Sequence, residues 1–123
     1  MTRTAWKSIC AEHGDRCVYC NKNLITPSRA TKTIWSPTSR TMDHVVAVKR
    51  GGSHDEANVV PACRRCNSKK CTRFWALLPE HQEIYVARMR RLGAEAFEQV
   101  MRRVPLSGRE WAEKTLAMCR AMP

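Results

Sequence analysis

Glycine, proline and long apolar runs are all scarce in this chain of 123 residues. Only 5 Gly and 6 Pro are present, which excludes collagen-like and low-complexity sequences. No apolar run approaches the roughly 20 residues that a membrane-spanning helix needs, so no membrane partner is expected. The first residues, Met-Thr-Arg-Thr-Ala-Trp-Lys, lack the apolar core of a signal peptide. We therefore expect a protein of the reducing cytoplasm.

Acidic residues are scarce as well, because 11 Asp and Glu stand against 22 Lys and Arg and leave a net charge of +11. The excess is uneven: residues 1–73 hold 14 basic and 5 acidic residues, and residues 74–123 hold 8 and 6. A solvated basic surface would account for the net charge alone. A positive field concentrated in one part of the chain is what a phosphate-binding surface requires. The asymmetry therefore favours a nucleic acid as partner.

Four of the seven cysteines form two C-x-x-C pairs, Cys17 with Cys20 and Cys63 with Cys66. This spacing lets both thiolates of a pair point at one ion, and four thiolates complete a tetrahedral zinc shell. A single pair is also typical of a redox dithiol, but two pairs favour structural zinc. Such a zinc ion would join distant segments of a small core. The other three cysteines are interpreted as small packing residues: Cys10, Cys71 and Cys119.

Hydrophobic periodicity predicts an α+β fold. Helices are expected over 3–13, 64–73, 80–92 and 94–104, with a last helix after a capping box at Ser107-Gly-Arg-Glu110. Extended segments are expected over 42–48 and 58–61, with a turn at Gly51-Gly52 between them. Residues 21–40 are interpreted as a hairpin excursion or a mobile loop.

The back half of the chain carries apolar residues at helical spacing but no recognisable chemistry. The positions expected to face inward are Ile84, Ala87, the stem of Arg88, Leu92, Phe97, Val100, Met101 and Val104. We therefore divide the chain into a core over residues 1–75 and a helical extension over residues 76–123. This extension is either packed on the core or accessory to it.

Polar residues between and beside the cysteine pairs are candidates for phosphodiester hydrolysis, which needs a general base and a divalent cation. His44 suits the base because the pKa of histidine lies near neutrality. Asp43 and Asn67 offer hard oxygen ligands for Mg²⁺, and Asn58 can hold the loop that orients the imidazole. The alternatives are a surface dipeptide for Asp43-His44, a turn residue for Asn58 and a helix cap for Asn67.

The ordered motifs resemble those of the HNH endonucleases over roughly residues 10–73. They are Cys17-x-x-Cys20, Asp43-His44, Gly51-Gly52, Asn58 and Cys63-x-x-Cys66-Asn67-x-x-Lys70. The resemblance implies a small ββα-metal core held by a four-cysteine zinc site, with C-terminal helices beside it. It also implies a bacterial or phage DNA endonuclease that leaves 5′-phosphate and 3′-hydroxyl ends.

Site roles follow from the resemblance at the matched positions. His44 would be the general base, Asn58 the orienting residue, and Asp43 and Asn67 the ligands of Mg²⁺ or Mn²⁺. Asn67 stands where many members carry His. Its amide oxygen can still bind the metal, and the exchange of residue bears on the metal preference. His54 is a further candidate to reach the phosphate; otherwise it is a solvated loop residue.

Basic residues on the turn and on the helix that carries Asn67 are expected to contact DNA phosphates without reading the base sequence. They are Lys49, Arg50, Arg64, Arg65, Lys69, Lys70 and Arg73; a solvated helix face is the alternative. The main alternative function is a zinc-ribbon-like DNA-binding module that does not cut. Such a module has no need for Asp43, His44, Asn58 and Asn67 together. The sequence leaves open duplex or branched DNA, single-strand nicking, and a homodimer that cuts both strands.

Overall fold

The computed structural model describes residues 1–26 and 36–121. In chain order its elements are α1 (Arg3–Glu12), β1 (Arg40–His44), the 3₁₀ helix η1 (Val48–Arg50), β2 (Val59–Cys63), α2 (Arg64–Lys70), α3 (Pro79–Leu92), α4 (Ala94–Arg102), the 3₁₀ helix η2 (Leu106–Gly108) and α5 (Arg109–Ala121). Within the described ranges, no helix is both long and apolar enough to cross a membrane.

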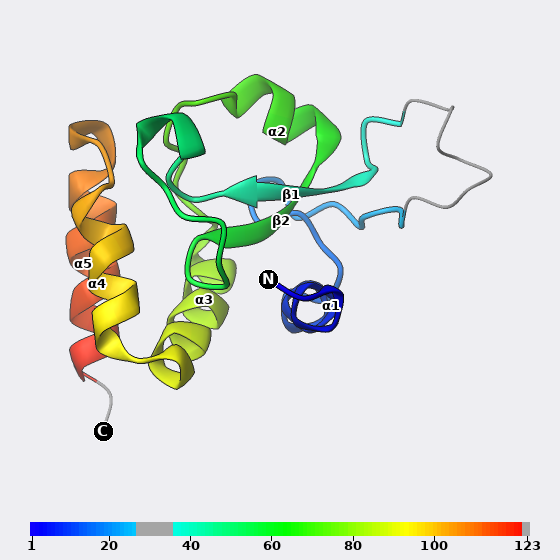
Figure 1. Ribbon diagram of the computed structural model, residues 1–123. Coiled ribbons are helices and arrows are strands. Elements are labelled where there is room, and N and C mark those ends of the chain that lie inside the picture. Colours follow the sequence, from blue (N-terminus) through cyan, green and yellow to red (C-terminus); the bar gives the residue numbers. More distant parts are fainter. Residues whose placement is uncertain (27–35, 122–123) are drawn as a thin grey trace.

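A two-stranded antiparallel sheet lies at the centre of the fold (Figure 1). In its register, Arg40 lies opposite Cys63 and His44 opposite Val59. Helix α2 follows β2 without a loop and lies on one side of the sheet, whereas α1 and α3 lie on the other side in Figure 1. The predicted α+β class, with a small ββα core and helices after it, is confirmed.

The first strand lies two residues earlier than predicted and is shorter. It spans Arg40–His44 instead of 42–48, because the chain leaves the sheet after Val45, whose N–H still bonds Asn58 O at 2.8 Å. The backbone of Val46 forms hydrogen bonds with a side chain and not with a neighbouring strand: Asn58 Oδ1 accepts from its N–H, and Asn58 Nδ2 donates to its C=O. Val45 and Val46 are nevertheless buried in the core.

The helices expected from the sequence are present, although some of their bounds differ. Helix α2 ends at Lys70 instead of Arg73 because Cys71 adopts a positive φ of 51°. The predicted break at Gly93, with a φ of 104°, separates α3 from α4. Ser107 lies within η2, so the last helix begins one residue later than the capping box implied. Residues 27–35 of the predicted 21–40 excursion lie outside the described residues. Its flanks form isolated bridges between Arg16 and Asn23 and between Ile25 and Ser39.

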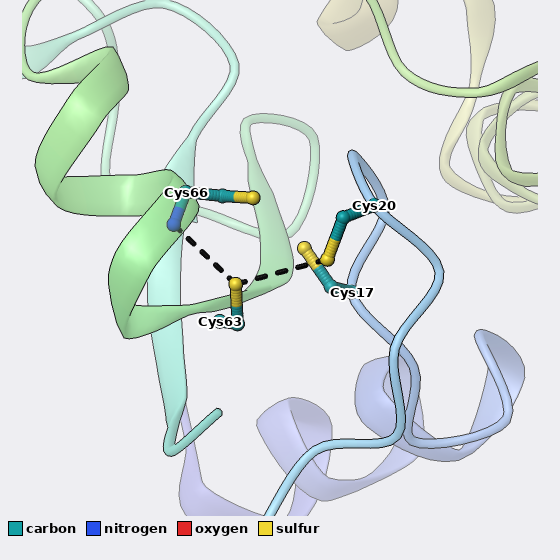
Figure 2. Close-up of side chains that lie close together, drawn as sticks. All are labelled: Cys17, Cys20, Cys63 and Cys66. Carbon is teal, nitrogen blue, oxygen red and sulfur yellow. Dashed lines mark hydrogen bonds between the residues drawn. The ribbon is translucent and has the colours of Figure 1, made fainter. Parts of the chain in front are cut away.

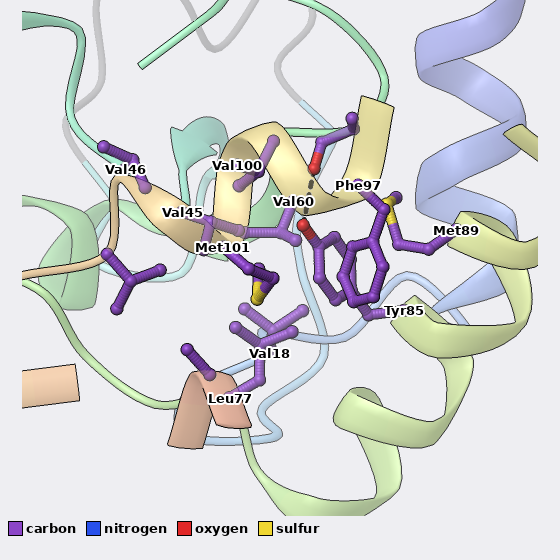
Figure 3. Packing of buried hydrophobic residues seen from close by; sticks show 13 residues of the cluster. Val18, Val45, Val46, Val60, Leu77, Tyr85, Met89, Phe97, Val100 and Met101 are labelled. Atoms are coloured by element: carbon purple, nitrogen blue, oxygen red, sulfur yellow. Dashed lines mark hydrogen bonds between the residues drawn. The ribbon is translucent and has the colours of Figure 1, made fainter. Parts of the chain in front are cut away.

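One hydrophobic cluster joins the sheet region to the C-terminal helices (Figure 3). Tyr85 and Met89 of α3 are fully buried in it, and the Tyr85 hydroxyl donates to Ala57 O. The buried face of α3 therefore differs in part from the expected inward face, because Ala87 and Leu92 are exposed. The cluster draws residues from both sides of position 75, so α3–α5 pack on the part of the chain that carries the motifs. The domain boundary at residue 75 stays a prediction.

Candidate metal and catalytic site

The four paired cysteines meet at one point between the loop after α1 and the start of α2 (Figure 2). Their Sγ atoms all lie within 4.8 Å of one another, and Cys20 Sγ is 3.8 Å from Cys63 Sγ. Four thiolates about 2.3 Å from a central zinc ion would be about 3.8 Å apart, so the group fits tetrahedral zinc. Backbone N–H groups face two of the sulfurs: Tyr19 N lies 3.5 Å from Cys17 Sγ and Cys66 N lies 3.3 Å from Cys63 Sγ.

Burial favours the protonated form of two of these thiols when no metal is bound. It raises the pKa of the Cys17 thiol to about 11 and that of Cys66 above its ordinary range. Both thiols are therefore neutral near pH 7 without a metal, and zinc binding has to release their protons. Among the described residues, these four form the only cluster of three or more His, Cys, Asp or Glu side chains close enough to share a metal ion.

Asp43 lies near the end of β1 and is only 4% exposed. Its carboxylate accepts hydrogen bonds from the Tyr19 hydroxyl and from Lys70 Nζ, which lies 3.2 Å from Oδ1 and 3.1 Å from Oδ2. Burial and the nearby Asp43 raise the pKa of Tyr19 well above its ordinary value, so its hydroxyl remains a donor. Asp43 is thus a buried anion with two fixed donors, and it also lines the pocket that contains His44.

Lys70 does not lie where the DNA-contact prediction placed it. Its side chain is fully buried, and its ammonium also donates to the backbone oxygen of His44 at 2.7 Å. A lysine enclosed in this way is not available to a phosphate at the surface. We correct its role to that of the cation that neutralises Asp43 and fixes the end of β1.

His44 is half-buried and lines a pocket of about 200 Å³, together with Asp43, Asn67 and Lys49. Its Nε2 lies 2.9 Å from Nδ1 of His54. Burial, followed by the neighbouring His54, lowers the pKa of His44, and Asp43 opposes this shift. The imidazole is therefore neutral near pH 7, which is the form that can accept a proton.

Asn58 is fully buried and joins two segments of the loop that follows β1. Its amide bonds both backbone groups of Val46, and its Nδ2 also donates to Ser53 O at 2.7 Å. Asn58 is therefore a loop-closing residue, and the loop that it closes follows His44. Its role in orienting the imidazole stays a prediction.

Asn67 lies on α2 and reaches across to β1. Its Nδ2 donates to Thr41 Oγ1 at 3.0 Å and lies 3.4 Å from Met42 O. With the nitrogen held by the strand, Oδ1 is the atom left for a cation, and the described residues give it no hydrogen-bond donor. The carboxylate of Asp43 and this amide oxygen are hard donors lining one pocket, which fits a Mg²⁺ or Mn²⁺ ion that keeps several waters.

The remaining basic candidates are exposed, but they lie around two different pockets. Lys49 lines the pocket of His44 and Asn67, and Arg50 donates to Thr72 O nearby. Arg65 and Lys69, four residues apart on α2, line a second pocket with Cys20 and Trp75. Residues two apart lie about 200° apart around a helix, so neither Arg65 nor Lys69 shares a face of α2 with Asn67. Arg64 and Arg73 are exposed as well.

Two features of this region were not foreseen. Tyr19 lies between two cysteines and carries no local signal of its bond to Asp43, which is 24 residues away. His13 and His81 belong to none of the sequence motifs, yet both are fully buried, and their Nδ1 atoms lie 3.0 Å apart. His81 also donates from Nε2 to Asn21 Oδ1 at 2.9 Å, which connects the pair to the loop that carries Cys20.

Comparison with known families gives one match. Residues 17–73 match the family described as HNH endonuclease. The matched segment contains both cysteine pairs, both strands and α2. No curated protein matches the chain.

Proposed function

Because residues 17–73 belong to the HNH endonuclease family, we propose that this protein is a metal-dependent endonuclease that hydrolyses DNA phosphodiester bonds. The family supports nuclease activity and metal binding in general terms. The observation that carries the specific proposal is the shared pocket: Asp43 and His44 from β1 and Asn67 from α2 line one cavity of about 200 Å³.

In the proposed reaction, the neutral imidazole of His44 takes a proton from water. The resulting hydroxide attacks phosphorus in line with the 3′-oxygen, which leaves, so that the products carry 5′-phosphate and 3′-hydroxyl ends. Asp43 and Asn67 would hold a Mg²⁺ or Mn²⁺ ion, which supplies charge stabilisation at phosphorus and at the departing oxygen. Lys70 and Tyr19 keep the Asp43 carboxylate in place through hydrogen bonds.

The cysteine cluster is proposed to hold structural zinc, because its thiolates tie the first loop to the start of the helix that carries Asn67. Exposed Lys49, Arg50 and Arg64, with Arg65, Lys69 and Arg73 on other faces, are proposed to contact phosphates. Lys70 is left out of this set because it is buried. The choice of duplex or branched DNA, a homodimer, a cytoplasmic location and a bacterial or phage origin stay predictions.

The test is cleavage of supercoiled plasmid with Mg²⁺ or Mn²⁺, comparing the wild type with His44→Ala. Loss of a general base lowers the rate by about 10²- to 10⁴-fold, and DNA ligase should reseal the wild-type nicks if the ends are 5′-phosphate and 3′-hydroxyl. Gln99→Ala, on the exposed side of α4, is the matched control. Zinc content and thermal unfolding show whether each variant is folded. Equal cleavage by His44→Ala would overturn the base assignment.

One observation favours the alternative of a DNA-binding module that does not cut. The carboxylate expected to hold the catalytic cation is already bonded to Lys70 and Tyr19. Mn²⁺ binding to the zinc-loaded protein, followed by electron paramagnetic resonance, separates the two functions. The nuclease requires Mn²⁺ binding that weakens in Asn67→Ala and not in Cys71→Ala, whose side chain lines the same pocket. A protein that binds DNA, does not bind Mn²⁺ and does not cut DNA would establish the binding module.

A further inference from the structure

The proposed base has a second histidine as its hydrogen-bond partner. His44 Nε2 and His54 Nδ1 are 2.9 Å apart, and the ring planes are tilted by 34°. Within the described residues, His44 Nδ1 and His54 Nε2 have no hydrogen-bond partner. The pair therefore uses one nitrogen of each ring internally and leaves the other two free.

The loop that carries His54 is held against the segment that follows His44. Asn58 Nδ2 donates to Ser53 O at 2.7 Å and to Val46 O at 2.9 Å, so one amide joins both segments. At Gly52, a Cβ atom would lie 1.8 Å from Val46 O. Only glycine permits this approach. The two histidines are brought together by this built loop, not by a chance contact of exposed side chains.

The direction of the hydrogen bond decides whether His44 can act as a base. A neutral imidazole carries one hydrogen, on one of its two nitrogens. If that hydrogen is on Nε2, it is donated to His54 Nδ1, and the lone pair of His44 Nδ1 is free. In the opposite arrangement, His54 donates to His44 Nε2, the hydrogen of His44 is on Nδ1, and His44 has no free lone pair for a proton.

Resting on the proposed nuclease function, we propose that His54 is a positioning residue that accepts the Nε2 hydrogen of His44 and keeps Nδ1 of His44 as the basic nitrogen. The proton from water then goes to His44 Nδ1, and the hydroxide goes to phosphorus. The resulting imidazolium keeps its Nε2–H bonded to His54 and later returns the Nδ1 proton to solvent. An acceptor behind the base has the orienting role that a carboxylate has in Ser-His-Asp triads, here filled by a neutral imidazole.

This assignment differs from a direct role of His54 on the phosphate. Its Nδ1 is already engaged with His44, and only Nε2 remains for another partner. A phosphate contact would make His54 contribute mainly to substrate binding. A positioning role makes it contribute to the chemical step, which is a distinction that kinetics measures.

The kinetic test compares His54→Ala with His54→Asn in plasmid cleavage. In asparagine, Oδ1 is as many bonds from Cβ as Nδ1 is in histidine, so it can accept the same hydrogen. We expect His54→Ala to lower kcat roughly 10- to 100-fold with KM almost unchanged, as for other residues that orient a catalytic group, and His54→Asn to restore most of kcat. Unchanged kcat in His54→Ala, a change in KM alone, or no recovery in His54→Asn would each overturn the proposal.

A second measurement needs no substrate. Two-bond ¹⁵N–¹H correlation spectra of ¹⁵N-histidine-labelled protein report which nitrogen of His44 carries the hydrogen. The expected result is the Nε2–H form in the wild type and in His54→Asn, and a mixture of both forms in His54→Ala. A wild-type Nδ1–H form would overturn the proposal. Failure of the nuclease function would look different, because the wild type would not cut while the His44 tautomer still responded to His54→Ala.

Discussion

Two histidine pairs in this protein have nearly the same geometry in different surroundings. The facing nitrogens are 2.9 Å apart in His44–His54 and 3.0 Å apart in His13–His81, and the ring centroids are 5.1 Å and 5.2 Å apart. His54 is exposed and His44 half-buried, whereas His13 and His81 have no exposed surface. Burial, the nearby Arg88 and His81 lower the pKa of His13 to about 3, whereas the pKa of His44 is lowered by burial and His54 and raised by Asp43.

Surroundings, not the contact between the rings, therefore separate a catalytic candidate from a structural one. His81 donates from Nε2 to Asn21, so in the neutral pair its Nδ1 accepts from His13 Nδ1–H. His13 Nε2 is then a buried lone pair without a partner among the described residues. It cannot exchange a proton with a substrate, because the His13 ring has no exposed surface. The free nitrogens of the other pair belong to a half-buried ring that lines a pocket and to an exposed ring.

The largest effect should come from removing what supports both pairs, the proposed zinc ion. Asn21 follows Cys20 directly, and the helix that begins after Cys63 carries Asn67 and Lys70. Structural zinc contributes about 10–16 kcal/mol of apparent binding free energy in small domains. We expect one zinc per chain by metal analysis, and cooperative loss of helical circular dichroism on adding a strong chelator. Cys17→Ser should behave like the chelated protein and Cys71→Ser like the wild type; a stable, metal-free wild type would contradict the zinc site.

The next effect should come from the ion pair between Lys70 and Asp43. Replacing Lys70 by Met leaves the buried Asp43 carboxylate without its cation, which typically costs about 3–5 kcal/mol. Lys69→Met, one residue earlier and exposed, is the matched control and should cost less than about 0.5 kcal/mol. Urea unfolding of zinc-loaded protein measures both. Equal stability of the two variants would show that Lys70 is not needed to neutralise Asp43.

Exchanging one histidine of each pair should separate stability from catalysis. His13→Leu fills most of the same volume but leaves His81 Nδ1 without a donor, a loss of about 1–3 kcal/mol. Its kcat should equal that of the wild type at a temperature where both are folded. His44→Leu should show the reverse, with cleavage lost and stability changed by less than about 1 kcal/mol. If His13→Leu lowered kcat while remaining folded, the contrast between the pairs would be wrong.

The motifs of the site were readable because their chemistry demands particular residue types at particular spacings. The four cysteines, and Asp43, His44 and Asn67 between and beside them, do come together. The burial of Lys70 was not readable, since lysine is mostly exposed and follows another lysine in a basic run. The role of Lys70 depends on β1, because this strand places Asp43 next to the Lys70 side chain.

Pairings between residues far apart in the sequence were equally hidden. His13 and His81 are 68 residues apart, and neither stands in a motif. The β-branched run after His44 predicted strand over residues that are instead buried outside the sheet, because Val45 and Val46 suit a strand and a core equally well. Local pattern thus predicted the elements and the four cysteines that could share a metal ion, while the contacts around them depend on the assembled fold.

The smallest effect, the pH dependence of stability, also separates the two pairs. His13 has a folded-state pKa of about 3, below its ordinary value of 6.5. Between these values the unfolded chain binds a proton that the folded chain does not. Stability should therefore be constant above about pH 6.5 and fall as the pH decreases below it, by up to about 1.4 kcal/mol per pH unit for one proton.

Burial and the positive charge of the nearby Arg88 lower the pKa of His13, and this sets the direction of the pH effect. Urea unfolding of the wild type and of His13→Leu at pH 7.5, 6.5, 5.5 and 5.0 isolates the contribution of this histidine. The stability difference between the two proteins should shrink steadily toward pH 5. A difference that is independent of pH would mean that His13 is protonated in the folded protein or that another group dominates the acid response.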